Sequence, residues 1–302
     1  MSGRVARALL AAATALALGT AAAGAHAAAT WADPAKVLHI AFPVAETGFD
    51  PAAAQDYYSA NVMRMVFDSL YVPDYLARPY RPSANTAEGM PEISADGRVW
   101  KIHVKKGVYF ADDPAFKGRK RELTAQDYVY SWKRVVDPKV RSPNAYYLTG
   151  KLVGLDDAVA KASKTGKFDY DAEIAGLRAT DRYTLQLTLT ETDYTLMDFL
   201  QQTALAAVAR EVVDAYGDAS TWVMEHPVGT GPYRLKTWRR GQKMVLEANP
   251  GYREEYFPAA PDNADASTKA LAAARRGKRL AHIGLVDSYV SEEANPWRLA
   301  FD

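Results

Sequence analysis

A short stretch rich in glycine and proline, residues 227–232 (PVGTGP), strongly constrains the backbone of this chain. Proline holds its own φ at about −65°, and glycine reaches conformations closed to other residues, so the stretch predicts a stiff, sharply bent loop. Apolar and polar side chains then alternate over residues 233–238, with the period of a β-strand. Arg240-Gly241 precedes a second strand-like run at 244–247. The whole segment predicts a loop that leads into a β-hairpin.

The same stretch carries no recognisable chemistry. Its Gly-x-Gly is not a dinucleotide-binding fingerprint, because Pro232 follows it and Arg234 stands where the third glycine is required. The chain also has no Walker A motif, no Gly-x-Ser-x-Gly nucleophile elbow and no cysteine. Its five histidines are not spaced to share a metal ion, and paired carboxylates such as Asp112-Asp113 are adjacent rather than facing. We therefore expect no catalytic residues, no metal site and no cofactor.

The composition is that of a globular protein, with 302 residues, 48% of them hydrophobic and 24% charged. This length allows two domains or one large one. The formal net charge of +1 gives no electrostatic case for nucleic acid or for an anionic membrane surface as partner. Aromatic residues make up 11% of the chain, which suits a binding surface as well as a core.

The N-terminus predicts export. Arg4 and Arg7 precede an uncharged run of alanine and leucine at 8–23, and Ala-x-Ala cleavage patterns follow at 25–27 and 27–29. We interpret residues 1–29 as a cleaved signal peptide. No lipobox cysteine is present, no disulfide can form, and no later apolar run is long enough to span a membrane. The mature chain is expected to be soluble and periplasmic.

Several elements can be predicted from hydrophobic periodicity and turn signals. The near-continuous apolar run at 37–42 is typical of a buried strand, and Ser59 can cap a helix that runs to about Leu70. Asp96-Gly97 predicts a hairpin turn before a strand over 100–104. Further helices are predicted over 124–136, 156–164, 193–202 and 211–216, and further strands over 183–190, 204–209 and 282–290. A last helix is expected to start at 291–293.

Six separate stretches, in order along the chain, carry a family resemblance. Residues 90–100 (MPEISADGRVW) and 123–134 (LTAQDYVYSWKR) are the longest of them. The others are the opening strand and loop at 38–51, the helix at 61–70, the segment at 179–185 and the glycine-rich loop at 228–233. Together they resemble the family 5 extracellular solute-binding proteins, the peptide-type receptors of ABC importers. The resemblance covers roughly residues 36–300 and corresponds to the N-terminal portion of the family.

The resemblance implies a mixed α/β fold like that of type 2 periplasmic binding proteins. The chain would hold the first lobe and the family's inserted extra domain, and the second lobe would be missing. The implied boundaries are a first part of lobe I at 30–67, the inserted domain at 68–192, and a second part of lobe I at 193–302. The implied mechanism is closure of two lobes around a ligand by a hinge motion.

The resemblance also implies a ligand cleft. By alignment with the loop that lines it, Gln55, Asp56, Tyr57 and Tyr58 would lie at the cleft, and flat tyrosine rings with a hydroxyl suit peptide contact. Asn144 stands where oligopeptide receptors carry a tyrosine, so the ligand class stays open.

Two functions remain open from the sequence. The first is a monomeric periplasmic protein that delivers peptides or peptide-like solutes to the membrane permease of an ABC importer. The second is an exported non-transport interaction protein, or a non-functional fragment of such a receptor.

Overall fold

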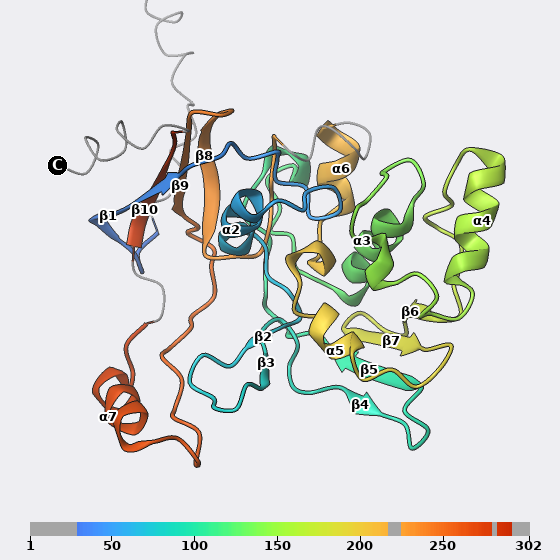
Figure 1. Cartoon of the computed structure of the whole chain (residues 1–302). Coiled ribbons are helices and arrows are strands. Elements are labelled where there is room, and N and C mark those ends of the chain that lie inside the picture. Colours follow the sequence, from blue (N-terminus) through green and yellow to red (C-terminus); the bar gives the residue numbers. More distant parts are fainter. Residues whose placement is uncertain (1–28, 217–224, 280–282, 292–302) are drawn as a thin grey trace, which may run out of the picture.

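The computed structural model describes residues 29–216, 225–279 and 283–291, and its strands form two four-stranded sheets (Figure 1). Residues 1–28, which hold nearly all of the predicted signal peptide, lie outside the described part. So does all but the first residue of the helix start expected at 291–293.

The first sheet has the strand order β1-β10-β9-β8. β1 is parallel to β10, while β9 is antiparallel to both β10 and β8. β1, β8 and β10 therefore run in the same direction, and their carboxyl ends lie at the same end of the sheet. The strands are β1 (Asp33–Phe42), β8 (Tyr233–Arg239), β9 (Lys243–Ala248) and β10 (Ile283–Val290). The hairpin predicted behind the glycine-rich loop is confirmed as β8 and β9.

The second sheet is antiparallel throughout, in the order β4-β5-β7-β6. Gly97 forms its first turn with a left-handed φ of +70°, as the Asp-Gly signal predicts. Trp100, Ile102 and Val104 are buried on one face, which confirms the predicted alternation. The strands are β4 (Glu92–Ile93), β5 (Val99–His103), β6 (Leu177–Ala179) and β7 (Thr184–Thr188); β2 (Tyr71–Pro73) and β3 (Pro82–Ala84) form a separate ribbon.

Six α-helices lie among the described residues: α2 (Tyr57–Val66), α3 (Ala125–Val136), α4 (Leu155–Thr165), α5 (Leu196–Phe199), α6 (Arg210–Tyr216) and α7 (Ala266–Arg275). Single 3-10 turns occur at Pro114–Phe116, Ala145–Tyr147 and Thr203–Leu205. At the start of α3, the Asp127 carboxylate accepts from the Thr124 N–H at 2.7 Å, as a capping box requires. Gly166 closes α4 in the left-handed conformation that glycine favours.

Four local predictions are wrong. β1 is not a buried strand, because it lies at the edge of its sheet, and Val37 and Leu38 are 40% and 41% exposed. The helix at 57–66 is capped by Asp56 rather than Ser59, because the Ser59 hydroxyl is buried against the preceding loop. Residues 204–209 form a 3-10 turn and an extended segment instead of a strand, and α5 is shorter than the predicted 193–202 helix.

Two hydrophobic clusters make up the core. One fills the space between the second sheet and α3, with residues from Leu70 to Leu189 and from Leu196 to Val228. The other packs α2 against the first sheet, with Phe49, Val62, Met244 and Val286 almost fully buried. Tyr130 on α3 belongs to the second cluster, so α3 contacts both.

The glycine-rich loop is held against the C-terminal end of α2. The Gly231 N–H donates to the Val66 carbonyl at 2.9 Å, and the Gly229 carbonyl accepts from the Ala111 N–H at 2.8 Å. A β-carbon on Gly229 would lie 2.0 Å from the Val66 carbonyl oxygen. The loop is therefore rigid because it packs tightly, in addition to its proline content.

Candidate functional site

The candidate site lies at the carboxyl ends of β1, β8 and β10. The loop 43–56 follows β1 there, and the β8–β9 turn and the end of β10 lie beside it (Figure 1). The Val290 N–H donates to the Gln242 carbonyl at 2.8 Å, and the Ser291 N–H donates to the Phe42 carbonyl at 2.9 Å. Ligands of open α/β sheets bind outside the carboxyl ends of parallel strands, so this edge is where a ligand is expected.

A buried ion pair fixes the loop to α3. Arg134 donates two hydrogen bonds to the Asp50 carboxylate, at 2.7 and 3.1 Å, and the two side chains are 1% and 0% exposed. Burial opposes the charge on Arg134, yet the Asp50 carboxylate raises the pKa of the guanidinium above its usual value. The pair is bidentate and shielded from solvent, which is the geometry that holds two elements in one orientation.

Glu46 joins the same loop to the β8–β9 hairpin. One oxygen of its carboxylate accepts from the Trp238 indole N–H and, at 2.9 Å, from the Gly241 backbone N–H. The Trp238 ring packs on Phe49 with 4.6 Å between ring centroids. The loop is thus attached to α3 on one side and to the hairpin on the other.

Asp56 organises the start of α2. Its carboxylate accepts from the Ser59 N–H at 2.8 Å and from the Thr47 hydroxyl at 2.5 Å. Partial burial would raise the pKa of Asp56, but the hydrogen bonds from Ser59 and Thr47 outweigh it and hold the pKa below its usual value. The carboxylate is an N-cap of α2 and a link back to the loop.

Four of the five predicted site residues are consecutive in the chain, and Asn144 lies beside the residue that precedes them. Gln55 and Tyr57 are exposed, Tyr57 to 69%. Tyr58 is half-buried, with its ring 5.2 Å from that of Phe42 and 5.4 Å from that of Tyr57. Asn144 is buried, and its amide donates to the Ala54 carbonyl at 3.1 Å, directly before Gln55. Asn144 therefore holds the loop from its buried side, while Tyr57 is exposed to solvent.

Two arginines at this edge were missed from the sequence. Arg239 and Arg240 belong to the β8–β9 turn, and Arg240 donates to the Thr47 carbonyl at 3.2 Å. The sequence identifies the turn but not its neighbour, because the turn meets loop 43–56 only through the parallel pairing of β1 with β10.

Replacing Asp56 tests its role as a cap. Asp56→Ala is expected to lower the free energy of unfolding by about 1 kcal/mol, because α2 loses its N-cap. Since the folded-state pKa is depressed, the charge contributes fully above the unfolded-state pKa and its contribution is lost as the pH falls through the folded-state pKa. Urea denaturation should show that the difference in the free energy of unfolding between Asp56→Ala and wild type shrinks from neutral to acidic pH. Asp56→Asn should keep most of the cap, and a pH-independent gap for Asp56→Ala would contradict this account.

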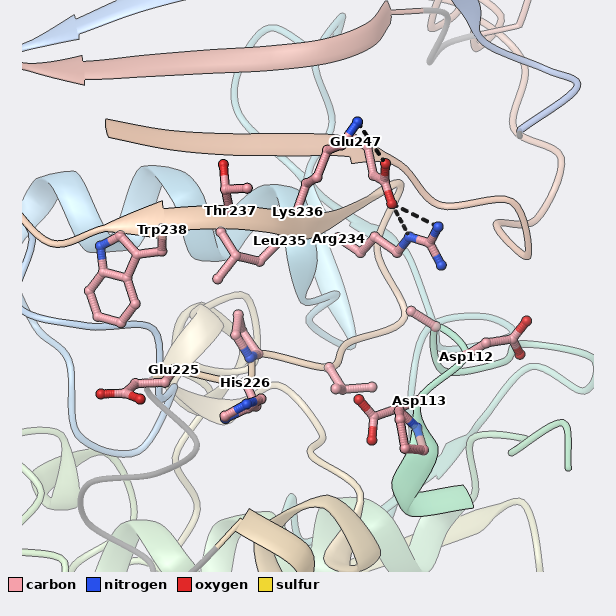
Figure 2. Close-up of a pocket in the computed structure, with 14 residues that line it drawn as sticks. Asp112, Asp113, Glu225, His226, Arg234, Leu235, Lys236, Thr237, Trp238 and Glu247 are labelled. Carbon is pink, nitrogen blue, oxygen red and sulfur yellow. Dashed lines mark hydrogen bonds and ion pairs between the residues drawn. The ribbon is translucent and has the colours of Figure 1, made fainter. Parts of the chain in front are cut away.

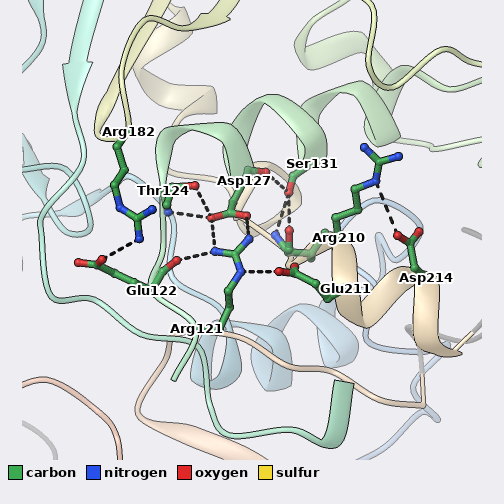
Figure 3. Close-up of polar contacts among 10 residues, drawn as sticks. Arg121, Glu122, Thr124, Asp127, Ser131, Arg182, Arg210, Glu211 and Asp214 are labelled. Carbon is green, nitrogen blue, oxygen red and sulfur yellow. Dashed lines mark hydrogen bonds and ion pairs between the residues drawn. The ribbon is translucent and has the colours of Figure 1, made fainter. Parts of the chain in front are cut away.

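Two other hollows contain charges that are already paired. A pocket of about 830 Å³ lies beside β8, where Arg234 and Lys236 both contact the Glu247 carboxylate (Figure 2). A second pocket, of about 750 Å³, is lined by Arg121, whose guanidinium group forms ion pairs with both Asp127 and Glu211 (Figure 3). These ion pairs hold neighbouring elements together.

Within the described part of the chain, no three histidine, aspartate or glutamate side chains are grouped to hold a metal ion. Among the helices of residues 29–216, 225–279 and 283–291, none is both long and apolar enough to cross a lipid bilayer.

Comparison with known proteins identifies the family. The family profile described as "Bacterial extracellular solute-binding proteins, family 5 Middle" matches residues 81–278. The chain belongs to this family. Its members are binding proteins, not enzymes. The relatives found include the periplasmic oligopeptide-binding protein OppA of Salmonella typhimurium, 31% identical over 205 residues, which are 67% of this chain and 34% of that protein. The dipeptide-binding protein of Lactococcus lactis is 26% identical over 256 residues, 83% of this chain and 42% of the relative.

Solved structures agree on the fold. The pheromone receptor PrgZ superposes with a TM-score of 0.65 at 22% identity, over 88% of this chain and 45% of that one. OppA of Haemophilus influenzae, solved in complex with the peptide RPPGFSPFR, gives a TM-score of 0.65 over 89% and 45% of the two chains. The chain thus has a mixed α/β fold of the type 2 periplasmic binding protein class. It spans about a third of the length of the OppA proteins that it matches.

Proposed function

We propose that this chain is part of a periplasmic receptor that captures peptides or peptide-like solutes and delivers them to the permease of an ABC importer. The observation that carries the proposal is the anchored loop at the carboxyl edge of the first sheet. The loop exposes Gln55 and Tyr57 to solvent, and the buried residues Asp50 and Asn144 hold it in place. The relatives named for peptide binding support the ligand class. The alanine-rich start of the sequence and the periplasmic relatives support the location.

The proposed roles follow from exposure. Tyr57 offers a flat apolar face and a hydroxyl to a ligand backbone, and Gln55 offers an amide that can donate and accept. The Tyr58 ring packs against the Tyr57 ring. Asp56 caps the start of α2, and Asn144 holds the backbone of loop 43–56. Hinge closure over this surface would enclose the ligand.

We propose the domain boundaries 30–67 and 193–302 for lobe I and 68–192 for the inserted domain. The composition of the two hydrophobic clusters supports them, because the first draws mainly on Leu70 to Leu189 and the second on Phe42 to Phe67 and Tyr233 to Val286. Residues 196–213 contribute to both clusters and form part of the contact between the two units, together with Tyr130 and Arg134 of α3.

Peptide binding by the full protein that carries these residues tests the function. A pool of short peptides is expected to raise its melting temperature, because a ligand that binds only the folded state stabilises it. Tyr57→Ala should weaken binding about tenfold, as expected for an aromatic anchor at a binding site. Tyr75→Ala is the matched control, since Tyr75 is equally exposed, at 72%, but lies outside loop 43–56. Failure of every peptide to shift the melt would favour the exported non-transport protein instead.

A further inference from the structure

The β8–β9 turn carries two exposed arginines on a fixed backbone. The Gln242 N–H donates to the Arg239 carbonyl at 2.9 Å, and Gly241 adopts a left-handed φ of +67° that a glycine tolerates without strain. Glu46 accepts from the Gly241 N–H, so the turn is also attached to loop 43–56. Both guanidinium groups therefore sit on a backbone whose position is set before any ligand arrives.

The turn is directly connected to the candidate peptide surface. Arg240 donates to the carbonyl of Thr47, and the hydroxyl of Thr47 donates to Asp56, the residue before the exposed Tyr57. Two hydrogen bonds thus connect the guanidinium group to the residue next to that tyrosine. A ligand lying on Tyr57 would come within reach of the turn.

The carboxylates near the turn are bound by groups of the protein itself, whereas neither turn arginine forms an ion pair with a described residue. One oxygen of Glu46 accepts from Trp238 and Gly241, Asp50 binds Arg134, and Asp56 accepts from Ser59 and Thr47. Within the described residues, no carboxylate lies within ion-pair distance of either Arg239 or Arg240.

Arg239 also belongs to a like-charge pair. Arg239 lies directly opposite Lys243 in the β8–β9 ladder, and like charges that face each other across strands are destabilising. Lys243 turns to Asp287, 3.0 Å away, and Arg239 remains exposed. An anionic group bound at the turn would offset this repulsion.

We propose that Arg239 and Arg240 bind a carboxylate of the captured peptide and give the site a preference for anionic ligands. The inference rests on the proposed peptide-binding function and adds the charge class of the ligand. Guanidinium groups form paired, charge-assisted hydrogen bonds with carboxylates. The carboxylate can come from the C-terminus of the peptide or from an acidic side chain, and the two sources need separate measurements.

Calorimetric titration of the full protein with two pairs of tetrapeptides tests the proposal. The first pair is tetra-alanine as free acid and as C-terminal amide; the second is a tetrapeptide amide with glutamate or glutamine at its second position. In at least one pair, the peptide with the carboxylate is expected to bind about tenfold more tightly than its neutral counterpart. This gap in affinity should shrink at high salt. The pair that shows the gap identifies the source of the carboxylate.

The double variant Arg239→Gln/Arg240→Gln should abolish the gap. Lys161→Gln/Lys164→Gln removes the same charge from the exposed face of α4 and should keep it. Circular dichroism melts check that both variants fold. Equal affinity within both peptide pairs, or a gap that survives in the arginine variant, would overturn this inference and leave peptide binding intact. No binding of any of the four peptides would overturn the proposed function and this inference together.

Discussion

Replacement of Gly229 by alanine is expected to lower the free energy of unfolding by at least about 3 kcal/mol, near the upper end for overpacking. The new β-carbon would lie 2.0 Å from the Val66 carbonyl oxygen and 2.9 Å from the ring of Phe67. The first neighbour is backbone at the end of α2, so it cannot move without displacing the helix or the loop. The loop also accepts from Ala111 and pairs with Val66 through Gly231, so a shift would break hydrogen bonds as well.

Gly89→Ala is the matched control for this prediction. Gly89 has nothing within 4 Å of the position that a β-carbon would occupy, and its φ is not left-handed. Its replacement should change the stability by no more than about 0.5 kcal/mol. Urea denaturation followed by tryptophan fluorescence measures both variants. Equal stability of the two would show that the loop accommodates a side chain and is not held as described.

Arg134→Met is expected to lower the free energy of unfolding by about 3–5 kcal/mol, because it leaves the Asp50 carboxylate buried without a counter-charge. Asp50 is fully buried; its carboxylate accepts two bonds from Arg134 and one from the Ala52 N–H, and Arg134 is its ion-pair partner. The loss should also weaken peptide binding, since the loop that carries Tyr57 is attached to α3 through this pair. The second variant, Arg134→Met/Asp50→Leu, removes both charges and should recover much of the stability.

The exposed pair Lys120–Asp112 provides the control for the buried one. Its atoms are 2.8 Å apart, much as in the buried pair, but the two side chains are 61% and 58% exposed. Lys120→Met should therefore cost less than about 1 kcal/mol, since solvent screens the pair and already hydrates both groups. Thermal and urea melts of the two methionine variants, run side by side, make the comparison. Similar losses for both would show that burial is not what makes the Asp50 pair important.

The local elements of this fold were largely predictable from the sequence. The alternation of Trp100, Ile102 and Val104, the Asp-Gly turn before it, and the capping carboxylate of Asp127 depend only on residues a few positions apart. Each predicts its structure because a strand presents alternate side chains to one face and a helix start exposes unpaired N–H groups. The same holds for the hairpin behind the glycine-rich loop.

The candidate site was predictable only in part. The family resemblance pointed to the segment Gln55–Tyr58 and to Asn144, and in the structure Asn144 binds the carbonyl of Ala54, the residue before that segment. It gave no indication of Arg239 and Arg240, because their place depends on strand β10 lying between β1 and β9. No local pattern encodes the order of strands that are far apart in the chain.

The tertiary structure also decided which residues are buried. The apolar run of β1 is consistent with burial on both faces, yet Val37 and Leu38 are exposed because β1 is an edge strand. The pairing of Asp50 with Arg134 joins residues 84 positions apart, and the close contact at Gly229 exists only because α2 ends there. The sequence by itself determined the local elements and the family, through short-range periodicity and motifs. Burial, charge pairing and the composition of the candidate site depend on long-range contacts, which exist only once the strands and helices have packed.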